Sequence, residues 1–179
     1  MIFVCNLREL PEHAERLRPQ HLISLVPAAD QPPTPSLLDA RRHLRVEIDD
    51  IIEAASDQVL PAREHVESLL AFLDQRETGS STLVHCLAGV SRSMAAAMIA
   101  LTREFPGEEE HIARMMREAA PHANPNRLMI ALADDCLGLG GRLVKAREAM
   151  GPAQPVIEGP LVSLRYSLWS VEIGRALSR

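Results

Sequence analysis

The stretch from residue 82 to residue 101 constrains this sequence more than any other. It opens with a short apolar run that predicts a buried strand. Cys86 follows on a loop of small residues, and an alanine-rich apolar helix is expected to begin near Ser91 or Arg92. A strand, a tight loop and a helix N-terminus together form an anion site, because backbone N–H groups point inward and the helix dipole favours negative charge. The five residues between Cys86 and Arg92 are enough to surround a tetrahedral oxyanion, and the planar guanidinium of Arg92 can complete the cradle.

The same surroundings favour Cys86 as a nucleophile. A free cysteine has a pKa of about 8.5, and a helix N-terminus with a nearby guanidinium typically lowers it to roughly 3.5–7.5. The alternative is an inert core cysteine before an ordinary helix, with Arg92 on the surface, since cysteine is among the most buried residue types. The full string from His85 to Ser93, placed between a strand and a helix, favours the reactive cysteine.

Residues 85–93, His-Cys-Leu-Ala-Gly-Val-Ser-Arg-Ser, resemble the signature of the cysteine-based protein tyrosine phosphatase superfamily, and specifically its small dual-specificity branch. The resemblance implies that Cys86 attacks phosphorus, that a phosphocysteine forms and that water hydrolyses it. It implies further that Arg92 binds the phosphate, that Ser91 helps the thiolate leave and that His85 holds the loop from behind. The substrate-binding residues would be Leu87, Ala88, Gly89, Val90, Ser91 and Arg92.

A general acid is expected just after the alternating strand at residues 44–48. Protonation of the leaving oxygen contributes typically 10²–10⁴-fold, and active-site loops gather at the carboxyl ends of parallel strands. Asp49 and Asp50 end this strand, and the spacing favours Asp50, with Asp57 as a further candidate. The alternative is that these carboxylates only form a turn. In related phosphatases an aspartate follows a strand of this kind.

A second element resembles the same family. The Pro125-Asn126 step is similar to the Ser/Ala-x-Pro-Asn element before the last helix of dual-specificity phosphatases, which implies that Asn126 abuts the signature loop. From the residues alone, Asn126 is equally an N-cap.

The remaining sequence alternates strands and helices, which predicts an α/β fold with a central, mainly parallel sheet flanked by helices. The resemblance implies a protein tyrosine phosphatase-like arrangement, with the phosphate loop between a strand and a buried helix. Strands are expected at residues 2–5, 21–26, 44–48 and 82–84. Helices are expected to begin near residues 11, 61, 92, 108, 127 and 142.

The chain is expected to divide into a phosphatase domain, residues 1–150, and a linker with a C-terminal extension, residues 151–179. Residues 151–160 contain two glycines and three prolines, which predict a linker. Beyond them, apolar residues from Leu161 to Val171 recur near helical spacing. The extension holds Tyr166 and Trp169, and it could dock on its own domain or form a homodimer interface.

Composition excludes several function classes. The net charge of −5 argues against a nucleic-acid binder, and no apolar run is long enough for a membrane span. The apolar start is too short for a signal peptide. Three cysteines without a disulfide framework indicate a reducing compartment, so a cytoplasmic location is expected.

Scattered histidines predict no metal site, and no cofactor is expected. Cys5 or Cys136 could pair with Cys86 under oxidation.

The substrate class is narrowed by what the signature loop lacks. Phosphoinositide enzymes of the superfamily typically place lysines in this loop, where this chain has Leu87, Ala88 and Val90. A phosphoprotein or a small phosphomonoester is therefore expected, with phosphotyrosine as the default and a shallow pocket. Two alternatives remain: a phosphate-binding module without catalysis, and a rhodanese-like sulfurtransferase. The intact Cys86, Ser91 and Arg92 argue against the first, and the Ala-Gly-x-Ser-Arg-Ser sequence argues against the second.

Overall fold

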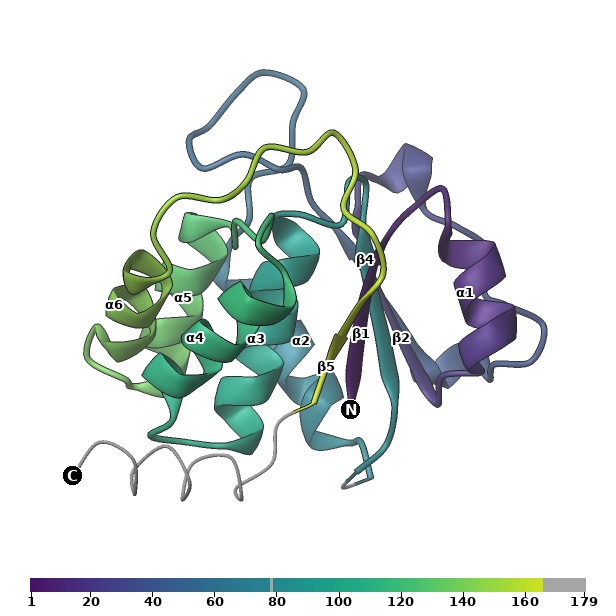
Figure 1. The fold of residues 1–179 in the computed structure, drawn as a ribbon. Helices are drawn as coiled ribbons and strands as arrows, with labels where there is room; N and C mark the ends of the chain where they lie inside the picture. The colour runs from purple at the N-terminus through teal and green to yellow at the C-terminus, as the bar shows by residue number, and fades with distance from the viewer. Residues whose placement is uncertain (78, 166–179) are drawn as a thin grey trace.

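The protein is described by a computed structural model that covers residues 1–77 and 79–165. In this part of the chain, five strands form one sheet in the order β3-β2-β4-β1-β5 (Figure 1). The strands are β1 (Ile2–Asn6), β2 (His21–Val26), β3 (His43–Glu47), β4 (Thr82–Cys86) and β5 (Val162–Leu164). The first four run parallel to one another, and β5 pairs antiparallel with β1. The predicted α/β fold with a mainly parallel sheet is confirmed.

Within the described residues, six helices flank the sheet on its two faces (Figure 1). They are α1 (Leu10–Leu17), α2 (Arg63–Asp74), α3 (Arg92–Glu104), α4 (Glu109–Ala119), α5 (Arg127–Leu137) and α6 (Arg142–Ala149), with single 3₁₀ turns at Ala28–Asp30 and Ala40–Arg42. Helix α1 covers one face over a small apolar cluster that includes Cys5 and Leu10. The other five helices cover the opposite face over the main core.

Helix α3 is the centre of the main core. Its alanine-rich sequence is buried without interruption from Arg92 to Thr102. Small side chains let the helix lie close to both the sheet and the neighbouring helices, and close packing leaves it little freedom to move. The predicted all-round burial of this helix is confirmed, and it fixes the end of the loop that holds Cys86.

Parallel pairing brings the functional segments to one edge of the sheet. Asn6 stands opposite Cys86 across β1 and β4, and Val26 stands opposite Glu47 across β2 and β3. The carboxyl ends of the four parallel strands therefore lie together, and the turns after β1, β3 and β4 meet there. This edge carries the signature loop and the segment after β3.

The C-terminal segment differs from the prediction. Residues 162–164 do not continue a helical pattern: Val162 and Leu164 are buried, Ser163 is exposed, and the three form β5. Residues 151–161, here called the strap, contain no helix or strand and cross from α6 to the β1 edge, yellow-green in Figure 1. The division into a phosphatase domain, residues 1–150, and a linker with a C-terminal extension, residues 151–179, stays a prediction. The interface expected around Tyr166 and Trp169 lies outside the described residues.

Candidate functional site

Cys86 is the last residue of β4, and its thiol lies below the surface. The residue is 1% exposed, and its Sγ lies 3.0 Å from the Ser93 Oγ. A thiolate can only accept, so the Ser93 hydroxyl must donate when Cys86 is ionised. The hydroxyl of Ser91, which the resemblance assigned to the sulfur, instead donates to Asp50 at 2.7 Å. The residue that reaches the thiol is therefore Ser93, which lies one position into α3 and whose side chain leans back toward the helix N-terminus.

The carbonyls of the signature loop point away from the loop's interior and accept hydrogen bonds from N–H groups of other segments. Their donors come from the β1–α1 turn, the strap, the α4–α5 loop and α3. The pairs are Leu7 N to Leu87 O at 3.1 Å, Gly159 N to Ala88 O at 2.8 Å, Asn124 N to Val90 O at 2.9 Å and Ala95 N to Ser91 O at 2.8 Å.

These outward carbonyls orient the loop's N–H groups. In a trans peptide the C=O and the following N–H point in opposite directions, and the described chain has no cis peptide bond. The N–H groups of Ala88, Gly89, Ser91 and Arg92 are therefore directed to the loop's interior. Four convergent backbone donors at a helix N-terminus can bind a phosphate.

Gly89 is required by this loop for two reasons. Its φ is +72°, a conformation that residues with a side chain rarely adopt. A Cβ at this position would also lie 2.9 Å from the backbone N of Asn6. The loop is thus wedged against the end of β1.

Arg92 opens α3 with a buried guanidinium. It is 4% exposed, and its Nη1 donates to the Ile48 carbonyl at 2.7 Å, which holds the side chain at the end of β3. Within the residues that the structure describes, its Nε has no hydrogen-bond partner, and the Asp50 Oδ2 lies 3.9 Å away. A buried guanidinium with an unused donor is costly unless an anion reaches it.

The structure separates the three candidate acids. The Asp50 Oδ1 accepts from the Ser91 Oγ at 2.7 Å, so this carboxylate lies at the signature loop. The Asp49 Oδ2 accepts from the Val59 N at 2.8 Å and closes the base of the loop that follows β3. Asp57 lies in that loop with a φ of 60°. Among the three, the signature-loop contact belongs to Asp50.

Asn126 combines the two roles left open by the sequence. Its Oδ1 accepts from the Leu128 N and the Met129 N, both at 3.1 Å, which caps α5. Its Nδ2 donates to the Asp50 Oδ1 at 2.9 Å. The cap fixes the amide, and the amide in turn fixes the carboxylate of Asp50.

His85 belongs to a buried polar chain behind the signature loop. Its Nε2 lies 2.6 Å from the Ser24 Oγ, which also lies 2.7 Å from the Nε2 of His43. Burial lowers the pKa of His85 to about 4, and the Arg92 charge acts in the same direction. Burial also lowers the pKa of His43 to about 4, with the Arg45 charge next in weight. Sequence reasoning missed Ser24 and His43, because only the pairing of β3 and β4 with β2 brings them to His85.

A pocket of about 500 Å³ adjoins the loop. It is lined by Asp50, Ile52, Ala88, Val90, Ser91, Asn124, Pro125, Asn126, Arg127, Arg147, Val156 and Ile157. None of these described lining residues is aromatic. Within residues 1–77 and 79–165, no three His, Cys, Asp or Glu side chains are placed to hold a metal ion. Over the same residues, no helix is long and apolar enough to cross a bilayer.

Comparison with known proteins gives relatives of one kind. No protein-family model matches the chain. Two curated proteins, the dual specificity protein phosphatase 15 of Mus musculus and of Rattus norvegicus, are 30% and 29% identical to it over 118 residues. The match covers 65% of this chain and 45% of each relative, so the chain spans less than half the length of these proteins.

Solved structures of the same kind share the fold. The Cydia pomonella PTP-2 phosphatase has a TM-score of 0.59 at 20% identity, covering 75% of this chain and 84% of that one. Human DUSP28 has a TM-score of 0.53 at 22% identity, covering 83% and 92%. A human tyrosine phosphatase-like serine/threonine/tyrosine-interacting protein has a TM-score of 0.59 at 19% identity, covering 78% and 92%.

The sheet, the helices and the loop between β4 and α3 define a protein tyrosine phosphatase fold. In sequence, the chain is similar to dual-specificity phosphatases of the cysteine-based protein tyrosine phosphatase superfamily.

Proposed function

We propose that this chain is a phosphatase that hydrolyses phosphomonoesters, with phosphotyrosine or phosphoserine/threonine in proteins as substrates, through a phosphocysteine on Cys86. The observation that carries the proposal is the buried Nε of Arg92, which has no hydrogen-bond partner among the described residues and stands beside inward-directed loop N–H groups. An anion with several oxygens satisfies all of these donors at once.

In the first step, the Cys86 thiolate attacks phosphorus from the loop's interior. The S–P bond forms while the P–O bond to the substrate breaks. Arg92 and the loop N–H groups hold the nonbridging oxygens, whose charge must be stabilised in the transition state. Asp50 gives a proton to the departing oxygen. Its contacts with the Ser91 Oγ and the Asn126 Nδ2 keep it at the loop's edge, where that oxygen leaves.

In the second step, water attacks phosphorus and the S–P bond breaks. Asp50, now ionised, takes the proton of the water. The sulfur leaves as a thiolate and needs a donor, which Ser93 supplies from 3.0 Å. Phosphate then leaves, and the site returns to its starting state without a metal ion in either step.

A catalytically inactive phosphate-binding protein is the second candidate, and one structural neighbour carries the words phosphatase-like in its name. The chain retains a thiol, a hydroxyl within 3.0 Å of it and a carboxylate at the signature loop. A module that only binds phosphate needs none of these three groups. They support the enzyme.

The test is hydrolysis of a fluorogenic aryl phosphate by the full chain in EDTA, at mildly acidic to neutral pH. We expect turnover in the native chain and its loss in Cys86→Ser. Asp50→Asn is expected to lower kcat by about 10²–10⁴-fold, whereas Asp49→Asn serves as the matched control and keeps most activity. No turnover by folded, reduced protein would refute the proposal in favour of the binding module. An Asp49→Asn loss equal to that of Asp50→Asn would refute the assignment of the acid.

A further inference from the structure

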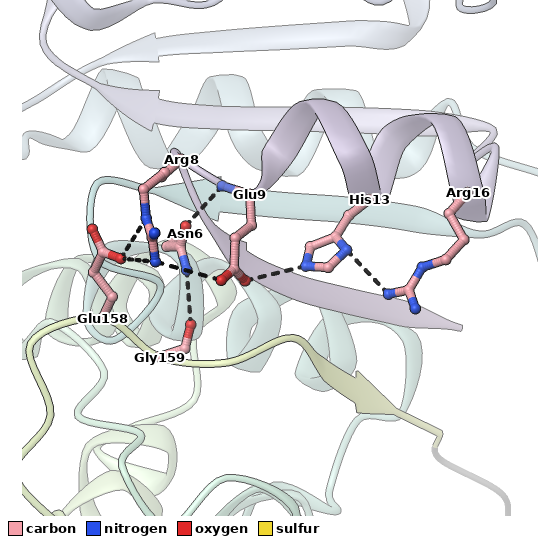
Figure 2. A network of polar contacts seen from close by, with 7 residues as sticks. All are labelled: Asn6, Arg8, Glu9, His13, Arg16, Glu158 and Gly159. Atoms are coloured by element: carbon pink, nitrogen blue, oxygen red, sulfur yellow. Dashed lines mark hydrogen bonds and ion pairs between the residues drawn. The ribbon is translucent and has the colours of Figure 1, made fainter.

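The strap is tied to the signature loop by its own backbone. The Gly159 N donates to the Ala88 carbonyl at 2.8 Å, and the Gly159 carbonyl accepts from the Asn6 Nδ2 at 3.1 Å. Figure 2 shows the second bond, together with the Asn6 side chain accepting from the Glu9 N at 2.9 Å. Asn6 is therefore fixed from two sides, and it fixes the strap in turn.

Two further contacts position the strap. The Nη2 of Arg8 lies 2.7 Å from the Glu158 Oε2, as Figure 2 shows, although this pair is exposed and worth less than the backbone bonds. Toward α6, the Gln154 N donates to the Pro121 carbonyl at 2.9 Å. A Cβ on Gly159 would lie 3.1 Å from the Gly89 carbonyl, so the strap lies directly against the loop.

Between these anchors, the strap presents two apolar side chains to solvent. Val156 is 44% exposed and Ile157 is 93% exposed. Both line the same pocket as Asp50 and Ser91. Ile52 of the loop after β3 lines it as well and is 37% exposed. Exposing apolar side chains on an anchored backbone is unfavourable in water, and apolar groups gathered at one site mark a binding surface.

The cations of the pocket already have partners. The Arg127 Nη2 lies 3.8 Å from the Glu53 Oε1 in an exposed and therefore weak ion pair. Arg147 donates to the Pro125 carbonyl at 3.1 Å and to the Asn124 Oδ1 at 2.9 Å. An acidic group beside the phosphate would have to compete for these guanidinium groups. An apolar group beside the phosphate would instead pack against Val156 and Ile157 and be removed from water. It would not compete for either guanidinium.

We propose that Val156 and Ile157 are specificity-determining residues, which bind apolar side chains next to the phosphorylated residue of a protein substrate. This inference rests on the proposed function of the adjacent site. A peptide is favoured over an anionic membrane because Glu158 directly follows Ile157, Glu53 lies beside the pocket residue Arg127, and the chain carries a net charge of −5. Membrane surfaces of that kind attract clusters of basic residues.

The test measures binding, so that it does not depend on turnover. Two phosphotyrosine peptides of equal length, one with apolar and one with acidic neighbours, are titrated into the full chain carrying Cys86→Ser, with anisotropy as the readout. We expect about tenfold tighter binding of the apolar peptide. Adding Val156→Ser and Ile157→Ser should remove this preference. Leu37→Ser, on a residue that is 72% exposed beside α1, is the matched control and should retain it.

Each outcome decides a separate point. Equal affinity for the two peptides, or a preference that survives the strap substitutions, overturns the inference even if the native chain hydrolyses aryl phosphate. Strap-dependent binding of vesicles that contain phosphatidic acid, without peptide preference, also overturns it and indicates a lipid. A strap-dependent peptide preference supports it even if aryl phosphate turnover is absent, in which case only the catalytic proposal fails.

Discussion

Acidification from pH 7 to pH 5 should destabilise the fold through the buried pair His85 and His43. Both have a pKa of about 4 in the folded chain, against an ordinary value of 6.5. Between these values the unfolded chain binds more protons than the folded one, so stability rises with pH. The contribution is complete above pH 6.5 and is lost progressively as the pH falls toward 4. Burial lowers the pKa of His21 and of His122 as well, which adds in the same direction.

The magnitude follows from His85, which is 0% exposed. At pH 5 its ring is protonated in most unfolded chains and neutral in most folded ones. One pKa unit corresponds to about 1.4 kcal/mol, so the free energy of unfolding should fall by about 2 kcal/mol from this group alone. His43 shares the Ser24 hydroxyl with it and titrates as its coupled partner, so the two contributions are not simply additive. The hydrogen bond to Arg41 lowers the pKa of Asp39 to about 2. Asp39 is therefore ionised at both pH values and does not contribute to the difference.

The assay is urea unfolding at pH 7 and pH 5, followed by circular dichroism. The midpoint should be clearly lower at pH 5. His43→Gln, which retains an amide for Ser24 but cannot titrate, should reduce the difference between the two pH values. Equal stability at both values, or greater stability at pH 5, would refute the reasoning, because it would mean that the buried rings accept protons as readily as the unfolded chain does.

Three further predictions concern the loop, the guanidinium and the extension. Gly89→Ala should lower the free energy of unfolding more than Gly107→Ala. Both positions have a positive φ, +72° and +89°, but the new Cβ would meet backbone atoms only at Gly89. Equal losses in urea unfolding would contradict this. Arg92→Lys should lower kcat/KM for an aryl phosphate by at least about 10²-fold, and a near-native rate would contradict the role of the planar fork. Ending the chain after residue 150 removes the buried Val162 and Leu164, so stability should fall by at least about 3 kcal/mol. Unchanged stability would instead show that residues 1–150 fold alone.

Much of the fold follows from local patterns. β2 is a continuous apolar strand, α3 is an apolar helix bounded by the signature loop and Pro106, and both form where their residues predict. β5 could not be predicted, because three residues carry almost no periodicity and the strand exists through its pairing with β1. The strap's prolines and glycines indicated the absence of a helix correctly. They carried no information about which backbone groups the strap would meet.

The site was predictable as a set of residue types, and less so in its contacts. Cys86 and Arg92 are fixed by a strand, a short loop and a helix that the sequence itself defines. Of the two aspartates, Asp50 contacts the signature loop and Asp49 bonds to Val59, while the role of Asp50 as the acid stays a prediction. Whether Ser91 or Ser93 contacts the Cys86 sulfur depends on where α3 begins. A difference of two residues turns a side chain to another side of the helix.

The most direct test of the account is to trap the covalent intermediate. The full chain is mixed with an aryl phosphate, quenched in acid within its first turnovers and digested. Peptide mass spectrometry then locates the phosphate. Ser93→Ala, which slows the second step, should increase the trapped fraction. We expect phosphate on the peptide that contains Cys86, and none there in Cys86→Ser. Turnover without a phosphorylated Cys86, or phosphate carried on another residue, would contradict the central claim that this thiol is the nucleophile.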